Sequence, residues 1–268
     1  MANEMIMKVK ADMKHDGHEI MVRKSNDLIQ KSRFNLSVPQ QRIIAYLLSQ
    51  ISPNDEEFKL YDFTISEFCR VCGIEYNGKN LNDLKAAIKD LADKSMWVYV
   101  GEETQTLVRW VEKPFIHEGT GTVQIKLDRD MIPFLLQLKE RYTQYELIYA
   151  LRFKSKYSIR LYELIKSRHY HEMEEYSFSY TVEELRQRLN AESYTQYKNL
   201  KMRILEPAIR EINAKSDIEL EWVESPPARR GVRVLSIEFT VRPKAAVERM
   251  KIRDEIEREL GWDQIALW

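Results

Sequence analysis

The pattern of apolar and polar positions predicts the same series of elements twice along the chain. Apolar residues recur at helical spacing over residues 39–51 and 155–168, and later helices are indicated near 80–94 and 194–215. After each later helix the period changes to the alternation of a β-strand. The predicted strands are 96–100, 107–115 and 123–127 in the first copy, and 219–223 and 232–241 in the second.

Short motifs align the two copies in the same order. The segment QRIIAYLLS at 41–49 matches IRLYELIKS at 159–167 in pattern. Farther on, Thr64 with Glu67 and Thr181 with Glu184 both form the T-x-x-E capping box that opens a helix. Colinear matches at a nearly constant separation indicate an internal repeat, with a small insertion in the second copy.

Three helices followed by a hairpin is the element order of a winged-helix domain. The sequence therefore predicts an α+β fold of two tandem winged-helix domains related by an internal repeat. Element order alone fits a DNA reader and a protein-contact domain equally well, because fold does not fix function. The expected divisions are an N-terminal extension 1–24, a first domain 25–140, a second domain 141–243 and a C-terminal helical tail 244–268.

The third helix of the second copy has a polar face suited to nucleic acid. A helical wheel places Gln196, Asn199, Arg203 and Arg210 opposite the apolar side, with Lys198 at the border. Arginine can pair with guanine through two hydrogen bonds, and Asn or Gln with adenine. A solvated helix face is the plain alternative.

Lys201 falls toward the apolar side of the same wheel, so it either extends along that surface or the helix bends near Pro207. We count it among the candidate DNA contacts.

Further basic residues accompany this helix. Arg229, Arg230 and Arg233 lie on a turn rich in Pro and Gly between two predicted strands, as a wing would. Upstream, a basic segment adds Lys154, Lys156 and Arg160 as candidate DNA contacts. The first copy lacks such a tip, and its third helix carries Asp83 and Asp90, which repel phosphate. We expect it to be the weaker DNA reader and freer for protein contact.

Composition narrows the classes of protein. Hydrophobic residues make up 44% and charged residues 31%, as in globular domains. The 42 basic and 42 acidic residues cancel, which argues against a binder that relies on bulk charge. The pattern shows no membrane span and no secretory signal near the start, so a cytoplasmic location is expected. The pair Cys69 and Cys72 lacks a second half-site for zinc, so two structural thiols are expected.

Four segments together resemble the iteron-binding replication initiators of theta-replicating plasmids, a tandem winged-helix family. They are SNDLI at 25–29, YTQYEL at 142–147, SKYSIRLYEL at 155–164 and LEPAIREIN at 205–213. The resemblance implies binding to direct repeats at an origin, help in opening the duplex, and recruitment of the host initiator and helicase machinery. It also implies repression of the protein's own gene by a homodimer joined through the first domain. No cofactor, metal or catalytic residue is implied.

Three other functions remain open. His169 and His171 form a His-x-His triplet with tyrosines downstream, which is reminiscent of a rolling-circle nickase. The triplet closes a predicted helix instead of lying on a strand, which disfavours that enzyme. A transcription regulator would share the architecture, and a partner-binding scaffold would bind no specific DNA.

Beyond residue 243, Ile252, Ile256 and Leu260 recur every fourth residue, which predicts a mostly exposed helix with a narrow apolar stripe. Docking onto the body is the simplest role for this stripe, and contact with a host replication protein is the alternative.

Overall fold

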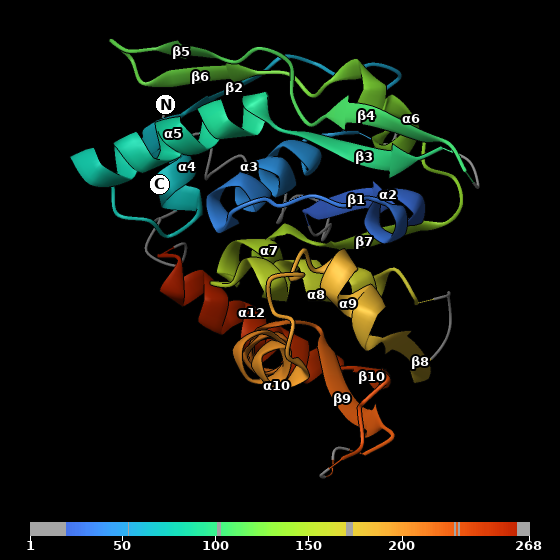
Figure 1. Ribbon diagram of the computed structural model, residues 1–268. Coiled ribbons are helices and arrows are strands. Elements are labelled where there is room, and N and C mark those ends of the chain that lie inside the picture. The colour runs from blue at the N-terminus through green and yellow to red at the C-terminus, as the bar shows by residue number, and fades with distance from the viewer. Residues whose placement is uncertain are drawn as a thin grey trace.

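The protein is described here by a computed structural model, which covers residues 20–52, 54–100, 103–169, 174–227, 229 and 231–261. Two similar bodies lie one above the other in Figure 1, and each combines three helical segments with a three-stranded antiparallel sheet. The first sheet has the order β2-β6-β5 and the second β8-β10-β9. The predicted pair of winged-helix domains is confirmed.

The first body consists of α3 (Val38–Leu48), β2 (Tyr61–Thr64), α4 (Ile65–Val71), α5 (Gly78–Asp93), β3 (Ser95–Tyr99), β4 (Gln105–Arg109), β5 (Phe115–His117) and β6 (Thr122–Ile125). The second consists of α8 (Lys156–Lys166), β8 (Tyr176–Thr181), α9 (Val182–Arg188), α10 (Tyr197–Leu200), η2 (Lys201–Leu205), α11 (Glu206–Lys215), β9 (Ile218–Ser225) and β10 (Ser236–Pro243). The remaining elements are β1 (Met21–Ser25), α2 (Asn26–Lys31), η1 (Arg129–Met131), α6 (Ile132–Leu135), β7 (Tyr142–Glu146), α7 (Leu147–Arg152) and α12 (Ala246–Glu259).

Both predicted capping boxes form. The carboxylate of Glu67 accepts a hydrogen bond from the Thr64 amide at 2.8 Å, and that of Glu184 accepts one from the Thr181 amide at 2.8 Å. The bond from the Thr181 amide lowers the pKa of Glu184, because it stabilises the charged carboxylate. Each pair fixes the start of a second helix, α4 or α9, at the end of a strand.

The first body contains a hairpin that the second lacks. β3 and β4 form a separate two-stranded sheet, and β5–β6 then occupies the place that β9–β10 has in the second body. The single strand predicted over 107–115 is wrong: β4 ends at Arg109 and β5 begins at Phe115. Trp110 and Val111 are neighbours and both buried, which is incompatible with the alternation of a continuous strand.

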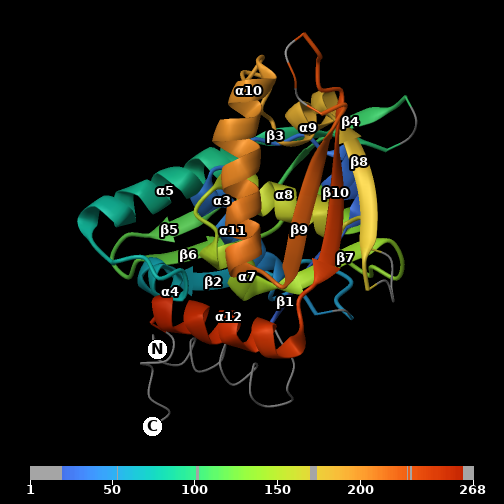
Figure 2. The same cartoon turned by 90° about the horizontal axis from the view of Figure 1, so that it is seen from below.

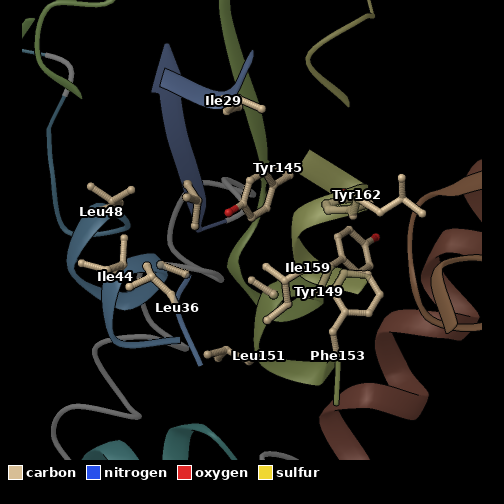
Figure 3. Close-up of a cluster of buried hydrophobic side chains, with 14 of the residues drawn as sticks. Ile29, Leu36, Ile44, Leu48, Tyr145, Tyr149, Leu151, Phe153, Ile159 and Tyr162 are labelled. Carbon is tan, nitrogen blue, oxygen red and sulfur yellow. The ribbon is translucent and has the colours of Figure 1, made fainter. Parts of the chain in front are cut away.

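The two bodies share a sheet and a core. β1 pairs antiparallel with β7, so residues 21–24 of the expected N-terminal extension belong to a strand. Figure 3 shows Ile44 and Leu48 of α3 facing the same apolar region as Ile159 and Tyr162 of α8. Buried residues of both bodies form one continuous hydrophobic cluster. This shared core joins the two domains.

The long third helix of the second body changes geometry in its middle. α10 passes into a π-helical turn, η2, before α11 continues the helix. Pro207 lacks an amide hydrogen, so the helical bond to the carbonyl four residues earlier is missing. The wider turn shifts the residues that follow, and Leu205 is buried next to the exposed Arg203. The predicted disturbance near Pro207 therefore takes the form of a π-turn.

Candidate nucleic-acid interface

The outer face of the long helix carries the predicted polar stripe. Leu200, Ile204 and Ala208 are buried against the domain, whereas the polar side chains of the opposite face are exposed. The exposed members are Gln196, Lys198, Asn199, Arg203 and Arg210. Their side chains are free of the core and can meet a DNA groove.

The wing lies at the same end of the molecule as α10. Figure 2 shows the loop between β9 and β10 rising beside α10 at the top of the view. Arg229 and Arg233 are exposed in this loop, and Gly231 turns the chain with a φ of +79°. Arg230 lies outside the described residues. We call Gln196, Lys198, Asn199, Arg203, Arg229 and Arg233 together the helix–wing surface.

Internal bonds hold the helix to the wing strands. Glu224 on β9 accepts hydrogen bonds from the Tyr197 hydroxyl at 2.6 Å and from the Lys201 ammonium at 2.8 Å. The Lys201 ammonium also lies 5.2 Å from the centre of the Trp222 ring. Lys201 was expected to contact DNA, but the structure uses it as a half-buried tether between η2 and β9.

Arg186 positions the start of the helix, a role that the sequence reasoning missed. Its guanidinium donates to the carbonyl oxygens of Tyr194 at 3.0 Å and Thr195 at 2.7 Å. These residues form the turn that leads into α10, so Arg186 sets where the long helix begins. Met202, also overlooked, is 55% exposed; it follows Asn199 by three residues and so lies on the same face of the helix as the polar side chains.

Arg160 does not belong to the interface. Only 4% of this residue is exposed, and Nη2 donates to the carbonyl oxygens of Ile29 at 2.7 Å and Ser32 at 3.1 Å. Nε donates to the carbonyl oxygen of Arg188 at 3.0 Å. Burial lowers the pKa of Arg160 to about 10, so the guanidinium stays charged at neutral pH. The prediction that Arg160 contacts DNA is wrong: it joins the carbonyl ends of α2 and α9.

Lys154 and Lys156 lie where α8 begins, between the two bodies. Lys154 is exposed, and the Lys156 ammonium donates to the Asn35 side-chain oxygen at 2.8 Å. Burial, with Lys94 nearby, lowers the pKa of Lys156. These lysines place positive charge between the third helices of the two domains.

The third helix of the first domain offers less positive charge. Lys85 forms an ion pair with Glu118, Lys89 with Asp93, and Lys94 with Asp90. Each of these three lysines has a carboxylate partner within the domain, whereas Lys79 at the start of the helix is exposed. That the first domain is the weaker DNA reader stays a prediction.

The described residues do not form the site of a nickase or of a zinc ion. The His169 ring packs 5.2 Å from the Tyr176 ring, while Tyr170 and His171 lie outside the described ranges. Within those ranges no cluster of three or more metal-binding side chains is found. Cys69 and Cys72 are buried, and burial raises the pKa of Cys72 to about 12. None of the described helices is long and apolar enough to cross a membrane.

The fold defines a tandem winged-helix protein, and the helix–wing surface gives it an exposed polar and basic face. The family model "Initiator Replication protein, WH1" matches residues 21–166, more than half of the chain, and "Initiator Rep protein, WH2" matches 181–241. The chain belongs to this family of replication initiator proteins.

Two relatives illustrate the likeness. A replication initiation protein of Escherichia coli is 23% identical over 212 residues, which are 75% of this chain and 65% of that protein. The Pi initiator protein, solved in complex with iteron DNA, superposes with a TM-score of 0.69 at 19% identity. The superposition covers 84% of this chain and 98% of Pi. At this identity the structural match establishes the shared fold.

Proposed function

We propose that this protein binds direct repeats of double-stranded DNA at a plasmid origin and initiates replication there. One observation carries the proposal: the exposed residues Gln196 and Asn199 stand at α10, which lies at the same end of the molecule as the loop that bears the wing arginines. Membership of the initiator family and the iteron complex of Pi support the same function.

The second domain would read the bases. In this arrangement α10 and η2 enter the major groove, where Arg203 pairs with guanine and Asn199 or Gln196 with adenine. Lys198, Arg210 and the wing arginines hold phosphates or the minor groove. Lys154 and Lys156 would then meet the backbone between the two domains, which leaves α5 a secondary contact.

Fluorescence anisotropy tests this function directly. DNA that flanks the protein's own gene is compared with scrambled DNA over a series of salt concentrations. Specific affinity about a thousandfold or more above non-specific affinity, centred on repeated sites, supports an origin binder. Equal, weak binding to both DNAs contradicts it and favours a partner-binding scaffold.

A test of plasmid replication distinguishes an initiator from a transcription regulator. We propose that the protein recruits the host initiator and helicase and performs no strand cleavage of its own. A plasmid that carries its origin should then be lost when the gene is disrupted and restored when it is supplied in trans. Normal plasmid maintenance without the gene would favour the regulator, and nicking of supercoiled origin DNA would favour the nickase.

The wing should contribute contacts that are independent of base sequence. We expect Arg229→Ala to weaken binding similarly on specific and scrambled DNA, because an exposed arginine on a turn meets phosphate or a narrow groove. The slope of log affinity against log salt should fall by about one, as for one lost phosphate contact. The matched control is Arg249→Ala, an exposed arginine on α12, which should leave both slopes unchanged. A selective loss on the specific DNA would instead assign base reading to the wing.

A homodimer joined through the first domain would serve repression of the protein's own gene. The β3–β4 hairpin presents Trp97 and Leu107, which face each other across the strands and are 54% and 50% exposed. Exposed apolar pairs of this kind mark association surfaces. We propose this hairpin as the dimer contact.

Trp97→Glu should shift the protein toward monomer, because a charge on the hairpin face cannot be buried in an apolar contact. Sedimentation equilibrium over a wide concentration range should show the dissociation constant of the dimer rise about tenfold or more. Phe115→Glu, at an aromatic residue equally exposed on a different sheet, is the control and should change nothing. A wild-type protein that stays monomeric at every concentration, with and without DNA, would refute the dimer.

A further inference from the structure

The helix α12 follows the second winged-helix domain. It lies beyond both family matches, the second of which ends at residue 241. It crosses the base of the molecule in Figure 2, from the lower end of α11 and β10 toward α4. In Figure 1 its far end reaches the side on which α4 lies. The helix thus extends from the second domain to the first.

The near end of this segment is anchored in the second domain. The Lys244 amide donates to the Asp217 carbonyl oxygen at 2.9 Å. The Lys244 side chain is buried and its ammonium donates to the carbonyl oxygen of Asn213 in α11. Both bonds fix the start of α12 to the carboxyl end of the long DNA-facing helix.

The middle of α12 is fixed to the segment that joins the domains. Ile252 and Ile256 are buried, and Arg253 forms an ion pair with Glu146, the N-cap residue of α7. Near the end of α12, Glu259 pairs with Arg152 of α7. The predicted apolar stripe is therefore docked onto the body, with ion pairs beside it.

The far end meets the first domain at a glycine. Gly73 follows α4 with a φ of +61°, and Leu260 packs directly against it. A Cβ atom at position 73 would lie 2.8 Å from Leu260 Cδ2, closer than carbon atoms pack, and 3.2 Å from Leu260 Cα, tighter than most such contacts. Leu260 itself is 8% exposed. The contact therefore depends on the absence of a side chain at Gly73.

We propose that α12 is a brace that holds the first winged-helix domain at a fixed angle to the second. The domains already meet on the opposite flank, where Arg160 joins α2 to α9 and Arg33 donates to Gln187 at 2.9 Å. A junction held by the shared core and by one flank resists rocking less than a junction that is also held on the other flank. The Leu260–Gly73 contact closes the other flank, so Leu260 and Arg253 act as positioning residues.

The brace matters for DNA because it fixes how both domains lie on one duplex, and this consequence rests on the proposed function. When two DNA-binding domains are held in a fixed arrangement, binding of one places the other beside its site on the same duplex at a high effective concentration. If the domains rock, contacts by the first domain form less often and fewer phosphates are neutralised together. Affinity and its salt dependence then fall together.

The test uses the full chain with Leu260→Asp, which places a charge against Gly73, and with Arg253→Ala as a second, milder variant. Met250→Asp is the control, because Met250 lies on the same helix and is exposed. The DNA-free readout is the distribution of distances between spin labels at Asn82 in the first domain and Glu219 in the second, both exposed. We expect a narrow distribution in the wild type and the control, and a broader one in the two brace variants.

On the repeat DNA, the brace variants should bind at least tenfold more weakly, with a salt slope reduced by one or two, at temperatures well below unfolding. Distance distributions and salt slopes that match the wild type in both variants would overturn the brace. A wild type without preference for the repeats would count against the proposed function, and the distance measurement would still decide the brace.

Discussion

Arg160→Ala should lower the free energy of unfolding by about 3–5 kcal/mol, the usual cost of removing one partner from a buried charged network. The change leaves the carbonyl oxygens of Ile29, Ser32 and Arg188 without their donor. It also removes the cation 3.9 Å from Glu163, which keeps Lys24 as its partner. Urea unfolding followed by tryptophan fluorescence measures the effect.

Two further variants separate the geometry of the buried guanidinium from its charge and from the general effect of removing an arginine. Arg160→Lys keeps the charge but cannot present the planar group that reaches both helix ends, so it should also be clearly destabilised. Arg210→Ala, on the exposed face of α11, should change stability by no more than about 0.5 kcal/mol. If the free energy of unfolding of Arg160→Ala lies within about 1 kcal/mol of the wild-type value, the buried guanidinium does not hold the two domains together.

Asn199→Ala combined with Arg203→Ala should remove most of the preference for the repeat sequence. A good bidentate contact contributes about 1–3 kcal/mol of discrimination, so the double variant should lose about a hundredfold in specific affinity. Binding to scrambled DNA should fall only severalfold, through the lost charge of Arg203. Both side chains are exposed, so the unfolding transition should not move.

Anisotropy on both DNAs, with Arg249→Ala as the matched surface control, measures this difference. The informative quantity is the ratio of specific to non-specific affinity at a single salt concentration. An equal loss on both DNAs would show that the stripe contacts phosphates only. An unchanged ratio would move base reading away from α10 and η2.

Local patterns in the sequence were sufficient for most of the fold. Both capping boxes and the polar stripe depend on residues three or four positions apart, and one helical turn fixes that spacing. The internal repeat shows in the order of such short motifs along the chain. Asn199 and Arg203 are exposed as the wheel predicted, because the residue that follows each of them, Leu200 or Ile204, is drawn into the core. The strand predicted over 107–115 was wrong because Trp110 and Val111 are both buried, and an alternating pattern does not predict two buried neighbours.

The roles of single charges were decided by the tertiary structure. Arg160 sits in a run of basic residues and resembles a DNA contact, yet its partners are carbonyl oxygens more than a hundred positions away in α2. Lys201 of η2 is likewise paired with Glu224 of β9, which lies beyond α11 in the chain. A cation is paired when folding brings an acceptor atom within about 3 Å of it. When that acceptor is far away in the chain, a local sequence pattern does not identify it.

The sequence by itself determined that this chain forms two winged helices and which face of the long helix is polar, because helical and strand periods are local properties. Only the tertiary structure decided how the two domains are joined. The pairing of β1 with β7, the buried Arg160 and the contact of Leu260 with Gly73 all link residues far apart in the chain. Such contacts arise from the packing of complete surfaces, and no short stretch of sequence specifies them.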